Sequence, residues 1–130
     1  MNKKILIVDD EVHIRALLEQ ALEDLEDEGV EIFLAREGEE GLRVAREENP
    51  DLMFLDIMMP KKNGYEVCEE IKGDPELKDI YIIMLTAKGQ AADRARGEEV
   101  KANEYITKPF NPDEILQKAS DILDIQILCS

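Results

Sequence analysis

Four short apolar segments of the chain each end at a side chain that could take part in chemistry. Asp9 and Asp10 follow the first segment, Asp56 follows the second, Thr86 follows the third, and Lys108 closes the fourth. The segments themselves are Ile5–Val8, Leu52–Leu55, Ile80–Leu85 and Tyr105–Ile106. If they are parallel strands, their carboxyl ends meet at one edge of one sheet. Three carboxylates, a hydroxyl and an ammonium group would then share a small pocket.

An acidic cluster of Asp9, Asp10 and Asp56 would favour a bound cation. Two carboxylates at close range repel each other by about 4 kcal/mol at an effective dielectric constant near 20. A divalent cation relieves this repulsion, and hard oxygen ligands with positions left for water and phosphate suit Mg²⁺ better than zinc or a soft metal. The alternative is that an aspartate caps the following helix and interacts with its dipole, while Asp56 forms a turn. The strand endings alone leave both interpretations open.

Phosphoryl transfer is the reaction that these side chains could support together. With a metal beside it, the Asp56 carboxylate could attack a phosphorus atom in line and hold the phosphoryl group as an acyl phosphate. The Lys108 ammonium could pair with a carboxylate at rest and with a phosphoryl oxygen after transfer. The Thr86 hydroxyl could donate to the same group. The alternatives are a solvated loop lysine and a threonine that merely ends its strand.

The segments between these endings must position them, and their pattern is that of an α/β fold. Apolar residues recur every three and four positions over about residues 11–28, which predicts a first helix ending at Gly29. The remaining predicted elements are a strand at 31–35 and helices at about 39–48, after Gly64 up to Gly73, at about 88–100 and at the end of the chain. Strands that are apolar throughout are buried on both faces, so the alternation predicts a doubly wound parallel sheet of five strands with five helices.

The composition fits a single acidic domain over residues 1–130. Sixteen basic and thirty-one acidic residues give a net charge of −15, which disfavours direct binding to nucleic acids and to anionic membranes. The longest apolar run is much shorter than the roughly twenty residues of a membrane span, and the apolar run near the start is too short for an export signal. Cys68 and Cys129 form no CxxC motif, which indicates reduced thiols in a cytoplasmic protein.

Four motifs carry a resemblance to a known family. They are Ile5-Leu6-Ile7-Val8-Asp9-Asp10-Glu11, Leu55-Asp56-Ile57-Met58-Met59-Pro60 with Gly64, Thr86-Ala87, and Tyr105-Ile106-Thr107-Lys108-Pro109-Phe110. In this order and at these spacings, over almost the full length, the chain resembles the receiver domain of two-component response regulators, the CheY-like family. The resemblance implies a flavodoxin-like sheet with the strand order 2-1-3-4-5.

The resemblance also implies the chemistry of the site. Asp56 is expected to accept a phosphoryl group from a sensor histidine kinase or a histidine phosphotransfer protein. Asp9, Asp10, Asp56 and the backbone carbonyl of Met58 are expected to bind Mg²⁺. A domain of this kind catalyses its own phosphorylation and dephosphorylation but converts no external substrate.

The response to phosphorylation is expected at the third and fourth strand endings, near Thr86 and Lys108. Thr86 and Lys108 are expected to bind the phosphoryl oxygens, and Tyr105 to act as the aromatic switch that turns inward as Thr86 moves. The Lys108–Pro109 bond is expected to be cis. The signal would reach an unknown protein target through the face formed by the helix at about 88–100, the strand ending at Lys108 and the last helix. The state of the protein would be a monomer or a phosphorylation-dependent dimer.

Some positions depart from the common pattern of the family, so the output partner cannot be transferred by analogy. The departing residues on the output face are Glu98, Lys101, Asn103 and Glu104. Met58 and Lys88 flank the expected path of an attacking water, and we hypothesise that they tune the lifetime of the phosphoryl group. The apolar residues near the end, Ile122 to Leu128, could finish the last helix or begin a further segment, so the chain could be a stand-alone receiver or a fragment of a longer regulator.

Two other classes of function compete with a receiver domain. One is a metal-dependent phosphatase with an aspartyl-phosphate intermediate, which is disfavoured because the DxDx[TV] arrangement is absent. The other is a flavodoxin-like carrier of FMN. It is disfavoured because the first strand leads into Asp9-Asp10-Glu11, which would repel the flavin phosphate.

Overall fold

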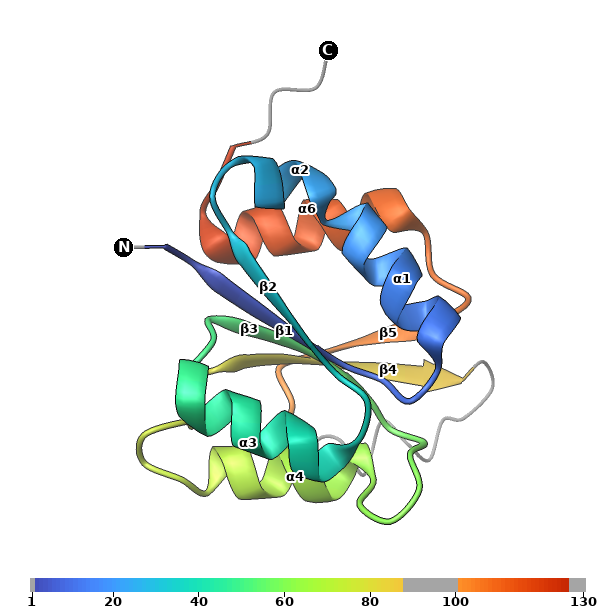
Figure 1. Ribbon diagram of the computed structural model, residues 1–130, viewed down its shortest axis with the longest axis vertical. Coiled ribbons are helices and arrows are strands. Elements are labelled where there is room, and N and C mark those ends of the chain that lie inside the picture. The colour runs from blue at the N-terminus through green and yellow to red at the C-terminus, as the bar shows by residue number, and fades with distance from the viewer. Residues whose placement is uncertain (1, 88–100, 127–130) are drawn as a thin grey trace.

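The computed structural model describes residues 2–87 and 101–126 of the chain. Their strands form one parallel sheet in the order β2-β1-β3-β4-β5 (Figure 1). The strands are β1 (Lys4–Val8), β2 (Glu31–Ala35), β3 (Leu52–Asp56), β4 (Tyr81–Ala87) and β5 (Glu104–Lys108). The predicted α/β fold and its strand order are therefore confirmed.

The central strands are buried on both faces, as their unbroken apolar character predicted. Every residue of β3 is buried, and so is every residue of β1 after Lys4. Successive residues of a strand point to opposite faces, and they enter two separate cores. Leu6 and Met53 belong to one core, whereas Ile5 and Phe54 belong to the other. The sheet is thus a buried partition between two hydrophobic cores.

Helices cover both faces of this sheet. The helices α1 (Val12–Ala21), α2 (Glu23–Asp27) and α6 (Pro112–Leu123) lie on one face, and α3 (Gly38–Glu48) and α4 (Gly64–Lys72) lie on the other (Figure 1). The predicted helix at about 88–100, with Lys88 and Glu98, lies outside the described residues, as do Ile127, Leu128 and Cys129. Within the described part of the chain, no helix combines the length and the apolar character needed to cross a bilayer.

The helices α4 and α6, which follow loops at the sheet's carboxyl edge, begin at capping residues. Asn63 and Glu66 form a capping box at the start of α4: the Asn63 side chain accepts from the Glu66 N–H at 3.0 Å, and the Glu66 carboxylate accepts from the Asn63 N–H at 3.2 Å. Asn111 accepts from the Asp113 N–H at 2.8 Å at the start of α6. Such caps contribute about 1 kcal/mol each. They fix the points at which the loops beside this edge end.

The first helix is not continuous over residues 11–28, and this prediction was wrong. The backbone at Leu22 has φ −98° and ψ 7°, which separates α1 from α2. Leu18, Leu22 and Leu25 are all buried, so the apolar stripe continues across the bend. The predicted end is confirmed, because Glu28 follows the last residue of α2 and Gly29 has a φ of +98°.

Residues at the start of β5 have structural roles inside the domain. The Asn103 side chain accepts from the Ile82 N–H at 2.8 Å and its backbone N–H donates to the Ile82 carbonyl at 3.0 Å, which extends the pairing of β4 with β5. Glu104 accepts from the Tyr81 hydroxyl and, at 2.8 Å, from Lys118 of α6. Two departures from the family pattern are thus explained by contacts between β4, β5 and α6.

The strand β2 is one edge of the sheet and pairs with β1 alone in the described structure. It is more exposed than the central strands, and Leu34 retains 39% of its accessible surface. Glu31 at its start is also exposed.

Candidate metal centre at the carboxyl edge of the sheet

The register of the sheet brings the polar strand endings together. Val8 pairs with Leu55, so Asp9 and Asp56 follow paired residues on neighbouring strands. On the other side of β3, Asp56 pairs with Leu85 of β4, the residue before Thr86. Lys108 pairs with Ala87 at the end of β5. The prediction that these endings meet at one edge is confirmed by these pairings.

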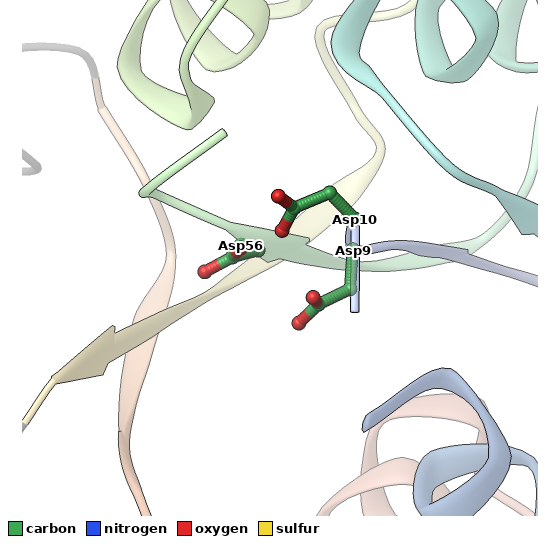
Figure 2. Close-up of side chains that lie close together, drawn as sticks. All are labelled: Asp9, Asp10 and Asp56. Atoms are coloured by element: carbon green, nitrogen blue, oxygen red, sulfur yellow. The ribbon is translucent and has the colours of Figure 1, made fainter. Parts of the chain in front are cut away.

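Three carboxylates form a cluster at this edge. Asp9, Asp10 and Asp56 each offer a carboxylate oxygen, and these oxygens all lie within 4.8 Å of one another. Figure 2 shows the three side chains lying close together, two after β1 and one at the end of β3. Asp9 and Asp56 are buried, whereas Asp10 is exposed. The cluster therefore has a buried base and one face that solvent reaches.

Lys108 joins the two buried carboxylates. Its Nζ donates to Asp9 Oδ2 at 3.1 Å and to Asp56 Oδ1 at 3.2 Å, and it lies 3.8 Å from Glu11 Oε1. Burial alone lowers the pKa of Lys108, but the charges of Asp56 and Asp9 outweigh it and raise the pKa above its usual value. The side chain is 19% exposed, so this ammonium is a partly buried component of the site and not a solvated loop lysine.

Asp9 is held in place by hydrogen bonds to its N–H, its carboxylate and its carbonyl. Its N–H donates to the Ala35 carbonyl at 3.2 Å, and its Oδ1 accepts from the Glu11 N–H at 2.9 Å. Its own carbonyl accepts from Arg15 Nη1 at 2.7 Å. The N-cap residue of α1 is Glu11, and within the described structure its side chain makes no capping hydrogen bond. The capping alternative therefore fails, and Asp9 bonds within the β1–α1 loop.

Asp56 is buried with one oxygen unsatisfied. The residue is 3% exposed, and its Oδ2 has no hydrogen-bond partner among the described residues. Burial raises the pKa of Asp56 from 3.8 to about 7, and the charge of Asp9 adds to this rise. Lys108 and the Met58 backbone N–H oppose it. Burial also raises the pKa of Asp9.

These observations fit a hard divalent cation. A buried carboxylate oxygen without a partner is costly, by about 1–3 kcal/mol, and such groups call for a specific explanation. Asp56 Oδ2 is such an oxygen, and the neighbouring ligand atoms of Asp9 and Asp10 are also carboxylate oxygens. An all-oxygen donor set with one open face matches the preference of Mg²⁺.

The loop after β3 approaches Asp56 closely at Gly64. A Cβ atom at Gly64 would collide with the Asp56 carbonyl and would lie 2.8 Å from the Ile57 Cα. The Gly64 N–H donates to the Ile57 carbonyl at 2.9 Å. Met58 lies in this loop with 63% of its surface exposed. Only glycine permits this close return of the chain, which carries Met58 past the carboxylates.

Lys62 anchors the same loop to the helices of one face. Its ammonium lies 3.0 Å from Glu39 of α3 and also pairs with Glu70 of α4. The Lys62 backbone carbonyl lies against Gly38, where a Cβ atom would approach it to 2.7 Å. The far end of the loop is thus fixed to both α3 and α4.

Thr86 and Tyr105 lie on neighbouring strands beyond Asp56. Thr86 is 3% exposed and pairs with Thr107, and Tyr105 pairs with Met84. Tyr105 packs against the core between the sheet and the helices α3 and α4, which is also the face reached by Met84. Alternation along the strand places Thr86 on this face as well. The Lys108–Pro109 bond is cis, as predicted.

Sequence reasoning missed Arg15 and gave Glu11 no role. An arginine on the first turn of an amphipathic helix usually faces solvent, so nothing in the sequence indicated its bond to the Asp9 carbonyl. Glu11 was visible only as part of a motif. Its N–H bond to Asp9 and its proximity to Lys108 follow from the loop geometry.

Comparisons with known proteins agree with this geometry. The response regulator receiver domain matches residues 5–120. The probable transcriptional regulator ycf27 of Cyanophora paradoxa is 46% identical over 94% of this chain and 48% of its own length. The alkaline phosphatase synthesis transcriptional regulatory protein PhoP of Bacillus subtilis is 44% identical over 95% of this chain and 49% of its own length.

A solved structure of similar length also matches. A putative response regulator from Chloroflexus aurantiacus has a TM-score of 0.85 and 34% identity, over 95% of this chain and 99% of that protein. The chain spans about half the length of the curated relatives it matches. The chain belongs to the response regulator receiver domain family.

Proposed function

We propose that this chain is a phosphorylation-switched signalling domain in which Asp56 accepts a phosphoryl group. The observation that carries the proposal is the state of the Asp56 carboxylate. One oxygen, Oδ1, is bonded to Lys108 at 3.2 Å, and the other, Oδ2, is buried without a partner among the described residues. With one oxygen bound to a cation and the other released from Lys108, a carboxylate can attack phosphorus through the released oxygen. Membership of the receiver family supports the same assignment.

The metal that this reaction needs would be held by the acidic cluster. Asp9, Asp10 and Asp56 would supply carboxylate oxygens, and the backbone carbonyl of Met58 would supply a further ligand. When bound, Mg²⁺ supplies positive charge that offsets the negative charge of the carboxylates and of the phosphoryl group. The oxygen-only donor set supports Mg²⁺ as the cofactor.

The transfer itself would use residues already in contact. An oxygen of ionised Asp56 attacks the phosphorus in line, an O–P bond forms, and the N–P bond to the donor histidine breaks with its electron pair left on the imidazole. Lys108 then exchanges its bond with Asp56 for a bond with a phosphoryl oxygen. Because the pKa of Asp56 is raised to about 7, the nucleophile is only partly ionised near neutral pH unless added positive charge lowers that pKa.

The switch would involve the two residues beyond Asp56. The Thr86 hydroxyl would donate to the phosphoryl group, and Tyr105 would turn inward as Thr86 moves. Their location on one face of β4 and β5 supports this coupling, because a shift of Thr86 changes the packing next to Tyr105. The signal would leave through β5, α6 and the predicted helix at about 88–100.

The partners follow from the same chemistry. The phosphodonor would be a sensor histidine kinase or a histidine phosphotransfer protein in the cytoplasm, and the downstream target would be a protein. The net charge of −15 argues against direct nucleic acid binding by this domain. We infer that residues 1–130 form one receiver domain, working as a monomer or as a phosphorylation-dependent dimer.

The proposal is tested by offering acetyl phosphate and Mg²⁺ to the purified chain. Intact-mass spectrometry should show one added phosphoryl group that is labile in acid, and peptide mapping should place it on Asp56. Chelation with EDTA should abolish the labelling. Asp51→Asn is the matched control, because Asp51 is an exposed aspartate that precedes the same strand, β3, at its other end. Labelling that persists in Asp56→Asn would contradict the assignment.

A further inference from the structure

Arg15 reaches from the first turn of α1 back to the β1–α1 loop. Its Nη1 donates to the Asp9 carbonyl at 2.7 Å, and the side chain is half-buried. Its backbone N–H donates to the Glu11 carbonyl at 3.1 Å. The guanidinium therefore ties the helix to the loop that carries two of the three clustered carboxylates. A charged donor at this distance makes a strong hydrogen bond.

The bond from Arg15 restrains a peptide group next to the cluster, because its acceptor is a backbone carbonyl. The Asp9 carbonyl belongs to the peptide group that joins Asp9 to Asp10, so fixing the oxygen fixes the plane of that peptide. Asp9 has further bonds through its N–H and its carboxylate. Asp10 is exposed, and its carboxylate offers one oxygen to the cluster. Holding this peptide restrains the backbone of Asp10 and therefore the point from which its side chain leaves the loop.

We propose that Arg15 is a positioning residue for the metal centre: its bond to the Asp9 carbonyl holds the Asp10 carboxylate within reach of Asp9 and Asp56. This inference rests on the proposed function, because it assumes that the cluster binds Mg²⁺. Arg15 bonds to a backbone carbonyl of the loop and would act on the metal through Asp10. Its contribution is to reduce the freedom that Asp10 would otherwise lose when the ion binds.

The charge of Arg15 makes the sign of the effect informative. A guanidinium this close to the cluster repels Mg²⁺, so removing the charge alone would tighten metal binding. Removing the bond to the Asp9 carbonyl would weaken it. The two effects oppose each other, and only a positioning role predicts weaker binding in a variant that lacks the positive charge.

The test compares Mg²⁺ affinity in three variants by titration followed through backbone amide NMR signals. Arg15→Met keeps much of the aliphatic stem and removes both the charge and the donor, and we expect its Kd for Mg²⁺ to rise about tenfold. Arg15→Lys keeps one donor and should restore part of the affinity. Arg46→Met is the matched control, because Arg46 is an exposed arginine in the last turn of α3 and its loss changes the net charge equally. Its Kd should equal that of the unaltered chain.

A second measurement separates positioning from loss of structure. The rate of Asp56 labelling by acetyl phosphate is measured against Mg²⁺ concentration. In Arg15→Met the half-saturating concentration should rise with the Kd, while the rate at saturating Mg²⁺ should return to that of the unaltered chain. If Arg15→Met does not fold, Arg15→Lys provides the test: its Kd for Mg²⁺ should be higher than that of the unaltered chain.

Several outcomes would overturn the inference. A Kd for Arg15→Met equal to or below that of the unaltered chain would show that the bond to Asp9 does not position a ligand. A lower labelling rate that saturating Mg²⁺ does not restore would assign Arg15 another role. If the unaltered chain binds Mg²⁺ but is not labelled on Asp56, the proposed function fails while the Kd comparison still decides the role of Arg15.

Discussion

Removing the charge of Asp56 should stabilise the metal-free protein at alkaline pH. The folded chain buries this carboxylate beside Asp9, and its pKa is raised from 3.8 to about 7. Ionised Asp56 therefore destabilises the folded state relative to the unfolded state, in which the carboxylate is hydrated. Asp56→Asn replaces the carboxylate by a neutral group of nearly the same shape. We expect the variant to have a higher free energy of unfolding at pH 8.

The magnitude follows from the pKa shift. One unit corresponds to about 1.4 kcal/mol, so the full cost of ionising Asp56 in the folded chain is about 4 kcal/mol. The sign is set by proton uptake: between pH 4 and 7 folded Asp56 binds a proton that unfolded Asp56 does not, so the unaltered chain gains stability as the pH falls. From pH 8 to pH 5 this gain is about 2–3 kcal/mol. The advantage of Asp56→Asn should shrink by that amount.

The assay is urea unfolding followed by far-ultraviolet circular dichroism, in EDTA, at pH 8 and pH 5. Subtracting the free energy of unfolding of the unaltered chain from that of the variant removes the titrations that both proteins share. Asp27→Asn is the control, because Asp27 is an exposed aspartate in α2, away from the cluster. Its difference from the unaltered chain should be small and should not depend on pH.

A difference that stays constant between pH 8 and pH 5 would refute the reasoning, because burial would then not be raising the pKa of Asp56. An Asp56→Asn variant that is less stable than the unaltered chain at pH 8 would also refute it. That result would mean that the ion pair with Lys108 outweighs the cost of burial.

Three further substitutions each test one structural feature of the domain by urea unfolding. Lys108→Ala should lower the free energy of unfolding by about 1–3 kcal/mol, because two buried carboxylates lose their shared donor. Unfolding should stay cooperative, and the labelling of Asp56 should fall sharply. Undiminished labelling would contradict this. Lys101→Gly should raise the free energy of unfolding by about 1 kcal/mol, because Lys101 has a φ of +67°, which glycine adopts without strain. An unchanged free energy of unfolding would show that the loop relaxes instead. Gly64→Ala should lower the free energy of unfolding by more than 2 kcal/mol, because a Cβ atom there meets the Asp56 backbone. Gly73→Ala is the control: Gly73 has a negative φ, and its substitution should lower the free energy of unfolding far less.

The sequence predicted the elements whose signals are local and missed those decided by packing. Unbroken apolar runs identified the strands, and Gly29 and Gly73 marked real helix ends. The break at Leu22 had no such signal, because a buried leucine continues the apolar stripe while the backbone bends. A pattern of side chains reports which face is buried but not whether the backbone stays helical along it.

The site divides in the same way. Asp9, Asp10 and Asp56 could be predicted to meet because a parallel sheet aligns the carboxyl ends of its strands. The strand endings could not decide between a helix cap and a metal centre. The Asp9 bond to the Glu11 N–H and the Asp56 oxygen that has no partner among the described residues argue against a cap and support a metal centre. Arg15 could not be found at all, since its partner is a backbone carbonyl, which no residue type reveals.

The open edge at β2 ties the solubility of the protein to its charge. Leu34 is 39% exposed on a strand that pairs with β1 alone in the described sheet, and an edge of this kind is a template for a strand from another copy. At neutral pH the net charge of −15 drives copies apart. Near the isoelectric point of about 4.4 that repulsion vanishes, while Leu34 stays exposed on the edge strand. We therefore expect acid-induced precipitation to begin with β2 strands of different copies aligning.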